Sequence, residues 1–338
     1  MTYTHLDNLP DNLPALYDEL LNARAEQAAP SGRGLSFVTK NIRHQVHWYL
    51  QLTVGSNRSQ HYLGPDSVEL RRQINSEKSL WEQAKPHIQR RQRLVRMLIS
   101  GGAATVTSAE ARVLEMLERV GIFVAGGVLV GTQPWSIYSN ILGVSWIPQT
   151  QTTPSAQPAS HQIIVGVPTK CTERKQALVD SGMGLFEVPI LDNKSTSTAF
   201  RFRGQDIRVD MLTPSHGKSS TKPIYLPAAA LSAAPTPFLD YLLEQAQPAV
   251  VVAKAGIMVN VPNPSRYALH GLACDSTMEG IQIIGGLLKV LLRDRAADVR
   301  KAWGAALHQP PEFVRQLDRH TQGLSPDTRE NLQALVKQ

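Results

Sequence analysis

The sequence predicts an α+β fold, in which a mixed sheet with packed helices is flanked by a small antiparallel sheet and a helical C-terminal region. Three patterns lead to this prediction: strand-like runs between residues 35 and 63, a helical pattern from about 67 to 100, and helical periodicity from residue 264 to the end. A chain of 338 residues with 42% hydrophobic residues is long enough and apolar enough to bury such a core.

The first predicted domain, residues 1–33, is one helix followed by a linker. Leucine and tyrosine side chains recur on one helical face between residues 12 and 28. Proline and glycine over 30–34 then interrupt the pattern. The first residues lack the basic and apolar segments of a signal peptide, and two cysteines, Cys171 and Cys274, are too few for a disulfide scaffold. We therefore expect a cytoplasmic protein.

The second predicted domain, residues 34–104, combines a small sheet with a long helix. Turn-forming residues separate three runs that we predict to form an antiparallel sheet, namely 35–42, 45–54 and 59–63. A helix is expected from about 67 to 100, with a possible break at Pro86, because proline removes a helical hydrogen bond.

The third predicted domain, residues 105–234, holds the mixed sheet, and the fourth, 235–338, begins with a hairpin and continues as helices. In the third we predict a helix over 108–120, a glycine-rich turn and helix over 126–142, a loop over 147–162, a strand over 163–167, a helix over 171–181 and a hairpin of 198–203 with 207–212. In the fourth we predict a helix over 237–245, a hairpin of 249–254 with 258–261, and helices that break near Cys274, Pro310 and Gly323.

The glycine-rich segment 126–132 is a candidate phosphate site. A helix N-terminus attracts phosphate through its unpaired N–H groups and its dipole, and glycine allows close approach of the backbone. Gly131 and Thr132 precede Pro134, which suits a first helical turn, so both are candidate phosphate-binding residues. The alternative interpretation is structural, with Thr132 acting as the helix N-cap and the glycine-rich segment serving tight packing.

Several motifs in order along the chain resemble a bacterial nucleotidyltransferase family with a DNA-polymerase-β-type core. The resemblance is carried by residues 62–66, 126–132, 142–146, 210–214 and 261–270. It implies nucleotide binding, with Arg266 and His270 as contacts beside Gly131 and Thr132. It also implies a pair of magnesium ions held by three acids, one of which would be Asp210.

The other two acids of that family motif are replaced in this chain. Aligning the motif on its flanking residues places Thr152 and Pro154 at the two acid positions, and neither side chain carries a carboxylate. Asp206 lies four residues before Asp210, about 13 Å away along an extended strand, so the two can share a metal only if the strand bends. Asp210 is then the sole residual catalytic and metal candidate, or an orphan acid that pairs with Arg208 or Arg266.

The basic second domain is the candidate nucleic-acid surface. Aromatic rings stack on bases and arginines contact phosphates, and the candidate residues here are Arg43, Trp48, Arg58, Arg90 and Arg91. The alternative is that Trp48 and Tyr62 form a small core between sheet and helix while the charges are solvated. The net charge of +7 favours a polyanionic partner, and no apolar run is long enough to span a membrane.

Three functional hypotheses remain open. The first is a catalytically impaired nucleotidyltransferase-like protein that binds a partner protein, a nucleic acid or a nucleotide and needs no cofactor. The second is an active, magnesium-dependent enzyme that transfers a nucleoside monophosphate to RNA or protein, as a toxin-like relative would, with Asp206 or Asp192 completing the site. The third is a nucleic-acid-binding accessory protein that acts through the basic second domain.

Overall fold

The computed structural model of this protein describes residues 3–26, 35–54, 57–148, 162–169, 185–188, 196–202, 204, 206–215, 222–275 and 277–337. Some predicted features lie outside these residues, namely most of the loop over 147–162, the helix over 171–181 with Cys171, and the positions Thr152, Pro154 and Asp192.

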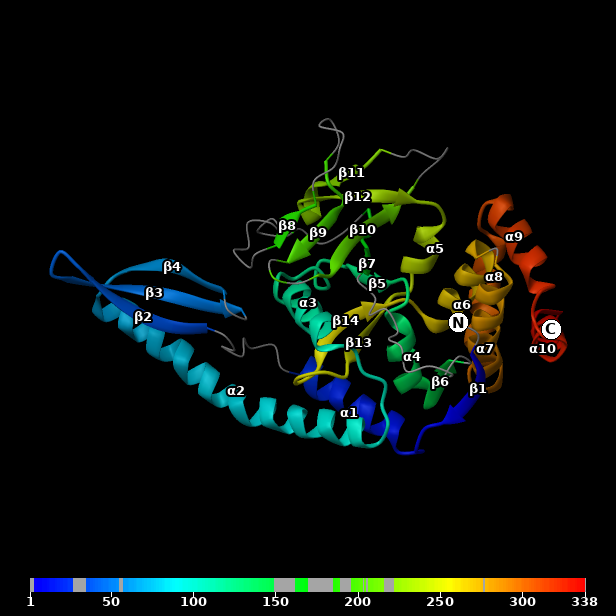
Figure 1. Cartoon of the computed structure of the whole chain (residues 1–338), viewed down its shortest axis with the longest axis horizontal. Helices are drawn as coiled ribbons and strands as arrows, with labels where there is room; N and C mark the ends of the chain where they lie inside the picture. The colour runs from blue at the N-terminus through cyan, green and yellow to red at the C-terminus, as the bar shows by residue number, and fades with distance from the viewer. Residues whose placement is uncertain are drawn as a thin grey trace.

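A mixed sheet of seven strands, counted over the described residues, forms the centre of the molecule (Figure 1). Five strands follow one another in the order β11 (Ile224–Leu226), β12 (Leu231–Thr236), β10 (Arg208–Pro214), β7 (Gln162–Gly166) and β5 (Val128–Val130). The first half of β10 also pairs with β9 (Ala199–Phe202), which carries β8 (Leu185–Glu187). β10 runs parallel to β7 and β12 but antiparallel to β9. The predicted α+β class and the hairpin of β9 with β10 are therefore confirmed, and the predicted division at residue 234 falls inside β12.

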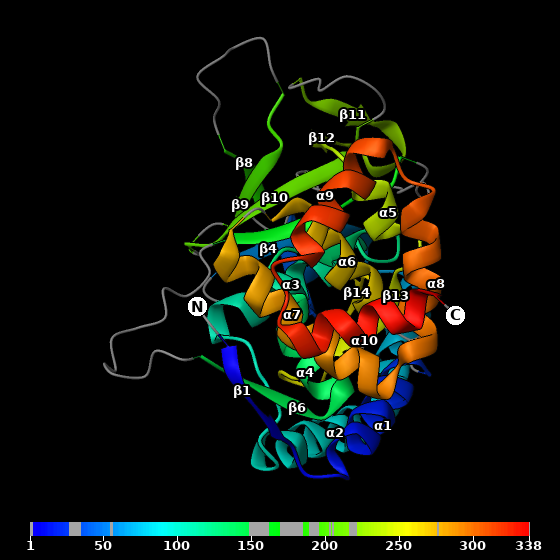
Figure 2. The same ribbon diagram turned by 90° about the vertical axis from the view of Figure 1, so that its right-hand side faces the viewer.

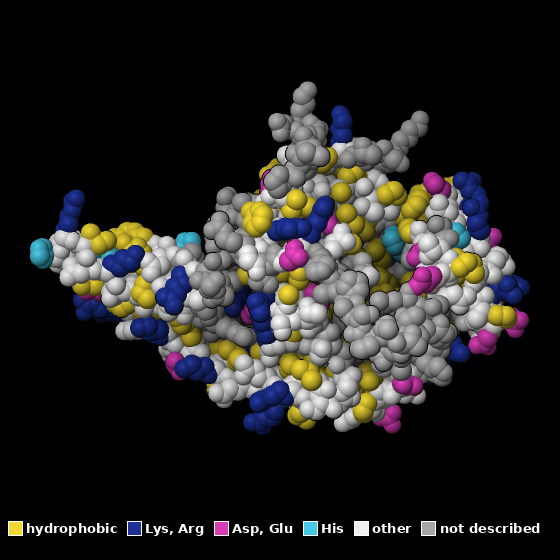
Figure 3. Space-filling model, in the orientation of Figure 1, with side chains coloured by type: hydrophobic (Ala, Val, Ile, Leu, Met, Phe, Trp, Pro, Cys, Tyr) yellow, Lys and Arg dark blue, Asp and Glu magenta, His cyan; other side chains and the backbone are white. Residues whose placement is uncertain are grey.

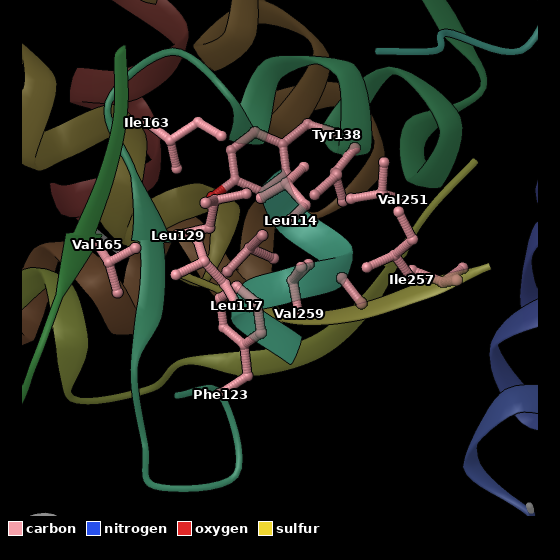
Figure 4. Packing of buried hydrophobic residues seen from close by; sticks show 14 of the residues in the cluster. Leu114, Leu117, Phe123, Leu129, Tyr138, Ile163, Val165, Val251, Ile257 and Val259 are labelled. Atoms are coloured by element: carbon pink, nitrogen blue, oxygen red, sulfur yellow. The ribbon is translucent and has the colours of Figure 1, made fainter. Parts of the chain in front are cut away.

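One face of this sheet is buried against two helices and a hairpin. The helices are α3 (Ser108–Arg119) and α4 (Pro134–Leu142), and the hairpin consists of β13 (Gln247–Val251) and β14 (Ile257–Val261). Figure 4 shows Leu129, Ile163 and Val165 of the sheet packed with Leu114 and Leu117 of α3, Tyr138 of α4 and Val259 of β14. All of them are fully buried, and each such aliphatic side chain contributes about 1.5–3 kcal/mol.

The opposite face of the sheet carries the short helix α5 (Leu239–Leu243). Leu239, Leu242 and Leu243 of α5 pack on Val128 and Val130 of β5, with Ile164 and Leu212 beside them. Because side chains alternate along a strand, Asp210 on β10 lies on this same face as Leu212. One face of the sheet therefore lies in the main core, and the opposite face carries both α5 and the polar residue Asp210.

A pair of strands that was not predicted joins the N-terminal segment to the core. β1 (Tyr3–Asn8) pairs antiparallel with β6 (Val144–Pro148). The helix α1 (Leu13–Ala25) follows and contacts both β13 and α4. The hydroxyl of Tyr17 donates to the Val250 carbonyl at 2.9 Å and accepts from the Val250 N–H at 3.0 Å, which anchors α1 on the hairpin.

The predicted three-stranded sheet is confirmed and projects from the body on a long helix (Figure 1). Its strands are β2 (Leu35–Ile42), β3 (Gln45–Val54) and β4 (Asn57–Pro65), and the helix is α2 (Val68–Ser100). α2 has 33 residues and is about 50 Å long, so its first half supports the sheet while its second half lies on the core. We call the sheet and the first half of α2 the arm.

The predicted break of α2 at Pro86 is wrong, because the helix runs continuously through this residue. A proline inside a helix removes a single backbone hydrogen bond, and tertiary packing can hold the helix together in spite of that loss. Ala84 before it and Leu94, Val95 and Leu98 after it are buried, so both sides of the proline are anchored.

The C-terminal region is helical, and Figure 2 shows its helices facing the viewer. In order they are α6 (Pro264–Cys274), α7 (Met278–Asp294), α8 (Ala296–Leu307), α9 (Pro311–Thr321) and α10 (Pro326–Lys337). The predicted breaks near Cys274, Pro310 and Gly323 are confirmed, and a further break occurs at Arg295 between α7 and α8. None of the described helices combines the length and the apolar character needed to cross a bilayer.

Candidate functional site

Asp210 lies in the first half of β10, with β7 on one side and β9 on the other. Its side chain is 11% exposed, and both of its oxygens accept hydrogen bonds. Oδ1 accepts from Nε of Arg208 at 2.7 Å, and Oδ2 accepts from Nε2 of Gln162 at 2.5 Å. Arg208 precedes Asp210 by two positions on the same strand, so strand geometry places both side chains on one face. The predicted pairing of Asp210 with Arg208 is confirmed.

The glycine-rich turn follows β5 and lies beside the strand that neighbours Asp210. Val130 of β5 stands opposite Ile164 of β7, which in turn stands opposite Asp210. Gly131 then takes a φ of +75°, and a Cβ atom there would come within 3.0 Å of Cδ1 of Ile164. Positive φ and this close approach both favour glycine at this position. Gly131 and Asp210 therefore occupy one side of the sheet with a single strand between them.

Two side chains that were not predicted hold this turn. Nε2 of Gln133 donates to the Gln162 carbonyl at 2.7 Å, and the hydroxyl of Tyr267 on α6 donates to the Gly131 carbonyl at 2.5 Å. These contacts join residues that are 29 and 136 positions apart in the chain. No local pattern reveals them, because each depends on which strands and helices become neighbours.

Thr132 is not the N-cap of α4, so the capping part of the structural interpretation was wrong, whereas its tight packing is found at Gly131. The N-cap is Gln133, and its side chain makes no capping hydrogen bond. The carbonyl of Thr132 accepts from the N–H of Trp135 at 3.2 Å, which adds a tight turn before the helix. Pro134 occupies the first turn of α4 as predicted.

Arg266 is buried behind α5, where it forms an ion pair. Its side chain is 4% exposed, and Nη1 lies 2.7 Å from Oε2 of Glu244 and donates to the Tyr241 carbonyl at 2.8 Å. The guanidinium carbon is also 4.7 Å from the centroid of the Tyr241 ring. The predicted alternative pairing of Arg266 with Asp210 is therefore not found.

His270 lies one turn further along α6, packed towards α9. Its Nε2 is 3.6 Å from Sγ of Cys274, and its ring centroid is 6.4 Å from that of Phe313. Removal from water lowers the pKa of His270 to about 4, against a weaker opposing effect of Asp240. The imidazole is therefore neutral at pH 7, and it offers a phosphate a hydrogen bond but no positive charge.

The acidic residues that the structure describes do not form a magnesium site. Magnesium requires hard oxygen ligands in octahedral geometry, chiefly carboxylates. Both oxygens of Asp210 are taken by Arg208 and Gln162, and Asp206 is 80% exposed and lies 3.7 Å from Arg201. Within the described part of the chain, no three His, Cys, Asp or Glu residues are grouped as metal ligands would be. The described residues therefore do not fit the metal pair that the resemblance implies.

The five predicted nucleic-acid contacts fall in two different places. Arg43 and Arg58 are exposed on the sheet of the arm. Arg90 pairs with Glu19 of α1 at 2.9 Å, and Arg91 is buried with its Nε donating to the Ala255 carbonyl at 3.1 Å. Burial lowers the pKa of Arg91 to about 10. Arg90 and Arg91 therefore lie where α2 meets the body, away from the sheet of the arm.

Trp48, the fifth predicted contact, faces α2. Its Nε1 donates to Oδ1 of Asp66 at 2.9 Å, and Nζ of Lys78 lies 5.9 Å from its ring centroid. On the same side, Phe37 stacks on Trp81 of α2 with ring centroids 5.0 Å apart. The predicted small core is thus confirmed for Trp48, whereas Tyr62 lies on the other face of the sheet and is 55% exposed.

Comparison with known proteins identifies the core. A protein-family profile described as nucleotidyltransferase matches residues 108–279, which is slightly more than half of the chain. The match covers the glycine-rich turn, the strand that carries Asp210, and α6, whereas the arm and the last three helices lie outside it. No curated protein and no solved structure matches the chain. The chain belongs to this nucleotidyltransferase family.

Proposed function

We propose that this protein is a nucleotidyltransferase-like binding protein whose metal-dependent transfer chemistry is impaired. The observation that carries the proposal is the environment of Asp210, whose carboxylate is neutralised by Arg208 and hydrogen bonded by Gln162. A magnesium ion at Asp210 would have to share the carboxylate with these donors. It would also stand close to a guanidinium, and two unit charges of like sign about 4 Å apart repel by about 4 kcal/mol near a protein surface, roughly twice that for a divalent ion.

The sequence supports the same proposal at the remaining ligand positions. Thr152 and Pro154 stand where the family motif has its two acids. A threonine hydroxyl is a neutral and weaker ligand than a carboxylate, and a proline side chain has no oxygen at all. With one neutralised carboxylate in place of three free ones, the site lacks the negative charge that would hold two divalent ions against their hydration shells.

The proposed activity is binding of a ligand by the intact scaffold. A nucleotide would place a phosphate on the backbone N–H groups of the turn at Gly131 and Thr132, which needs no metal. Arg266 and His270 would join such a site only if Glu244 released the guanidinium and the ligand reached behind α5. The alternative ligand is a partner protein or a nucleic acid, which a folded but catalytically impaired core would bind in place of a nucleotide.

The proposal is tested by measuring nucleotide binding and nucleotide transfer with and without magnesium. We expect the natural protein to bind a nucleotide equally well in both conditions and to transfer no labelled nucleotide to RNA or protein. The double variant Thr152→Asp with Pro154→Asp should gain magnesium-dependent binding, particularly when combined with Arg208→Gln. Magnesium-dependent transfer by the natural protein that is lost in Asp210→Ala would refute the proposal and establish an active enzyme.

A matched control separates the role of Arg208 from a general change in charge. Arg201 stands opposite Arg208 on β9 but pairs with Asp206 instead of Asp210. Arg201→Gln therefore changes the net charge as Arg208→Gln does and leaves the carboxylate of Asp210 neutralised. Only the variant at Arg208 should increase magnesium binding in the background of the two added acids.

The distribution of charge favours nucleic-acid binding through residues 34–104, which comprise the arm and the second half of α2, as a second candidate function. Residues 34–104 contain 11 Lys and Arg against 4 Asp and Glu, a net charge of +7. This equals the net charge of the whole chain, because the other 24 basic and 24 acidic residues cancel. Figure 3 shows Lys and Arg side chains along the arm. A positive module joined to a neutral body is the distribution expected of a protein that binds a polyanion.

A further inference from the structure

Among the residues that the structure describes, no helix covers one of the two faces of the sheet of the arm. Its other face packs on α2 through Phe37 and Trp48. Residues two apart along a strand share a face, and cross-strand partners point the same way. We call the uncovered face the open face; its outward side chains include Lys40, His47, Tyr49, Gln51, Arg58, Gln60 and Tyr62, together with the apolar Val38 and Ile42.

Aromatic and amide groups occupy the middle of the open face. Tyr49 and Tyr62 stand opposite each other with ring centroids 5.3 Å apart, and the Tyr62 hydroxyl is 2.9 Å from Nδ1 of His47. Gln51 and Gln60 form the next pair, joined by a hydrogen bond of 2.8 Å. These contacts hold the Tyr62 ring in place while leaving it 55% exposed. A fixed, exposed ring is a suitable surface on which a base can stack.

Cations surround this aromatic centre, and acids are missing from it. Nζ of Lys40 lies 4.6 Å from the centroid of the Tyr49 ring, and Arg58 stands opposite Thr53 at the far end of the face. The sequence contains no Asp or Glu from residue 34 to residue 65. The open face therefore carries positive charge alone, which complements a polyanion and repels cations.

The turn at the other end of the face is strained. Arg43 and His44 form the two-residue loop between Ile42 and Gln45, and their φ angles are +50° and +65°. Hairpin turns with two positive φ angles strongly prefer Asn-Gly or similar pairs, because side chains beyond Cβ are disfavoured there. Both residues are exposed, so their side chains do not fill the described core. Strain at exposed residues, one of which is the arginine Arg43, points to a functional use of the side chains.

We propose that the open face and the turn at Arg43 bind single-stranded nucleic acid, a proposal that rests on the second candidate function. Tyr62 and Tyr49 stack on unpaired bases, while Arg43, Lys40 and Arg58 contact phosphates. From Gln45 to Thr53 the face is about 27 Å long, which suits a short strand lying along it. A duplex keeps its bases stacked within the helix, so it would leave the tyrosine rings without a partner.

The proposal is tested by fluorescence anisotropy with the full chain at low salt. The probes are labelled oligo-U, oligo-dT and a mixed-sequence duplex of the same length. We expect both single strands to bind more tightly than the duplex, and Tyr62→Leu to weaken their binding by about 5-fold to 100-fold, as loss of one stacked base does. Tyr225→Leu is the matched control, because Tyr225 on β11 of the core is equally accessible at 60% exposure.

A second variant separates binding from stability. Replacing the turn by Arg43→Asn with His44→Gly relieves the strain, so the melting temperature should rise or stay constant while affinity for the single strands falls several-fold. A protein that unfolded would lose both properties together. Loss of stability without loss of affinity would contradict the role that we assign to the turn.

The outcomes also distinguish this inference from the candidate function on which it rests. If single strands bind, but Tyr62→Leu behaves like Tyr225→Leu and only Arg72→Gln on α2 weakens binding, the arm binds nucleic acid and the open face does not. If no probe binds at low salt, both the inference and the candidate function fail. Tighter binding of the duplex, unchanged in Tyr62→Leu, likewise overturns the inference.

Discussion

The core and the arm use charged side chains in opposite ways. In the core, cations lie against anions, as Arg208 does with Asp210 and Arg266 with Glu244. On the open face of the arm, cations surround aromatic rings and the strands contain no acid. An ion pair is electrically neutral and offers a charged ligand little attraction, whereas a surface of one sign attracts a polyanion over several ångströms. The comparison separates charges that support the fold from charges that are available to a partner.

α2 shows both uses along a single helix. Its first half belongs to the arm and carries the exposed Arg72, whereas its second half carries Arg90 and Arg91 where it meets the body. The same residue type therefore has different roles at positions about 20 residues apart. Variants along α2 are the most direct way to test the distinction.

The largest expected effect follows from Arg91→Ala. This substitution removes a buried side chain and leaves the Ala255 carbonyl without the Nε donor of Arg91, which should lower the free energy of unfolding by about 2–4 kcal/mol. Arg90→Ala is the adjacent control, and it should cost less than about 1 kcal/mol because its pair with Glu19 is exposed. Urea unfolding of both variants measures the difference. Equal losses of unfolding free energy in the two variants would mean that burial does not set the contribution of each arginine to stability.

The next effect is a pH dependence that arises from His270. Burial lowers its pKa from 6.5 to about 4 in the folded chain, so between these values the unfolded chain binds more protons than the folded chain. Stability should therefore fall as the pH decreases from about 6.5 to 4, by up to about 3 kcal/mol. Because other groups also titrate in this window, the test is the difference between the natural protein and His270→Gln. Unfolding curves at several pH values should show a shallower decline in the variant, and parallel declines would contradict the prediction.

The comparison also shows which features can be predicted from sequence. In the sheet of the arm, β2 and β3 were predicted to the residue and β4 to within two residues at each end, because the strands alternate regularly. The hairpins of β9 with β10 and β13 with β14 were predicted for the same reason. These features are local, since each strand pairs with its neighbour in the chain and each hairpin lies within about 20 residues.

Features that depend on distant contacts were missed. β1 pairs with β6 across more than 130 residues, and β5 has three residues in a glycine-rich run that looked like a turn. Within the site, the candidates Gly131 and Asp210 could be identified by their motifs, but their contacts with Tyr267 and Gln162 could not. Those contacts depend on strand order and helix placement, which composition and periodicity do not encode.

A smaller effect is expected at the pair that neutralises Asp210. Arg208→Gln removes the cation from a carboxylate that is 11% exposed, and we expect a loss of about 1–2 kcal/mol in stability. Arg201→Gln on the neighbouring strand should cost about 0.5 kcal/mol or less, because its partner Asp206 is 80% exposed. Thermal and urea unfolding of the two variants measure the contrast. If Arg208→Gln left stability unchanged, the pair would have no structural value, and the case for a neutralised, inactive acid would weaken.

The smallest expected effect concerns a single cation of the arm. Each phosphate contact that a protein makes with a single strand contributes about 0.7 to the slope of log affinity against log salt. Arg58→Gln should therefore make that slope shallower by about 0.7, with a modest loss of affinity at low salt and no change in stability, because Arg58 is exposed. Arg329→Gln on α10 is a matched control in the body, where the residue is half-buried and lies outside the arm. A slope that responds equally to both variants would mean that the charge of the whole chain, rather than the open face of the arm, attracts the strand.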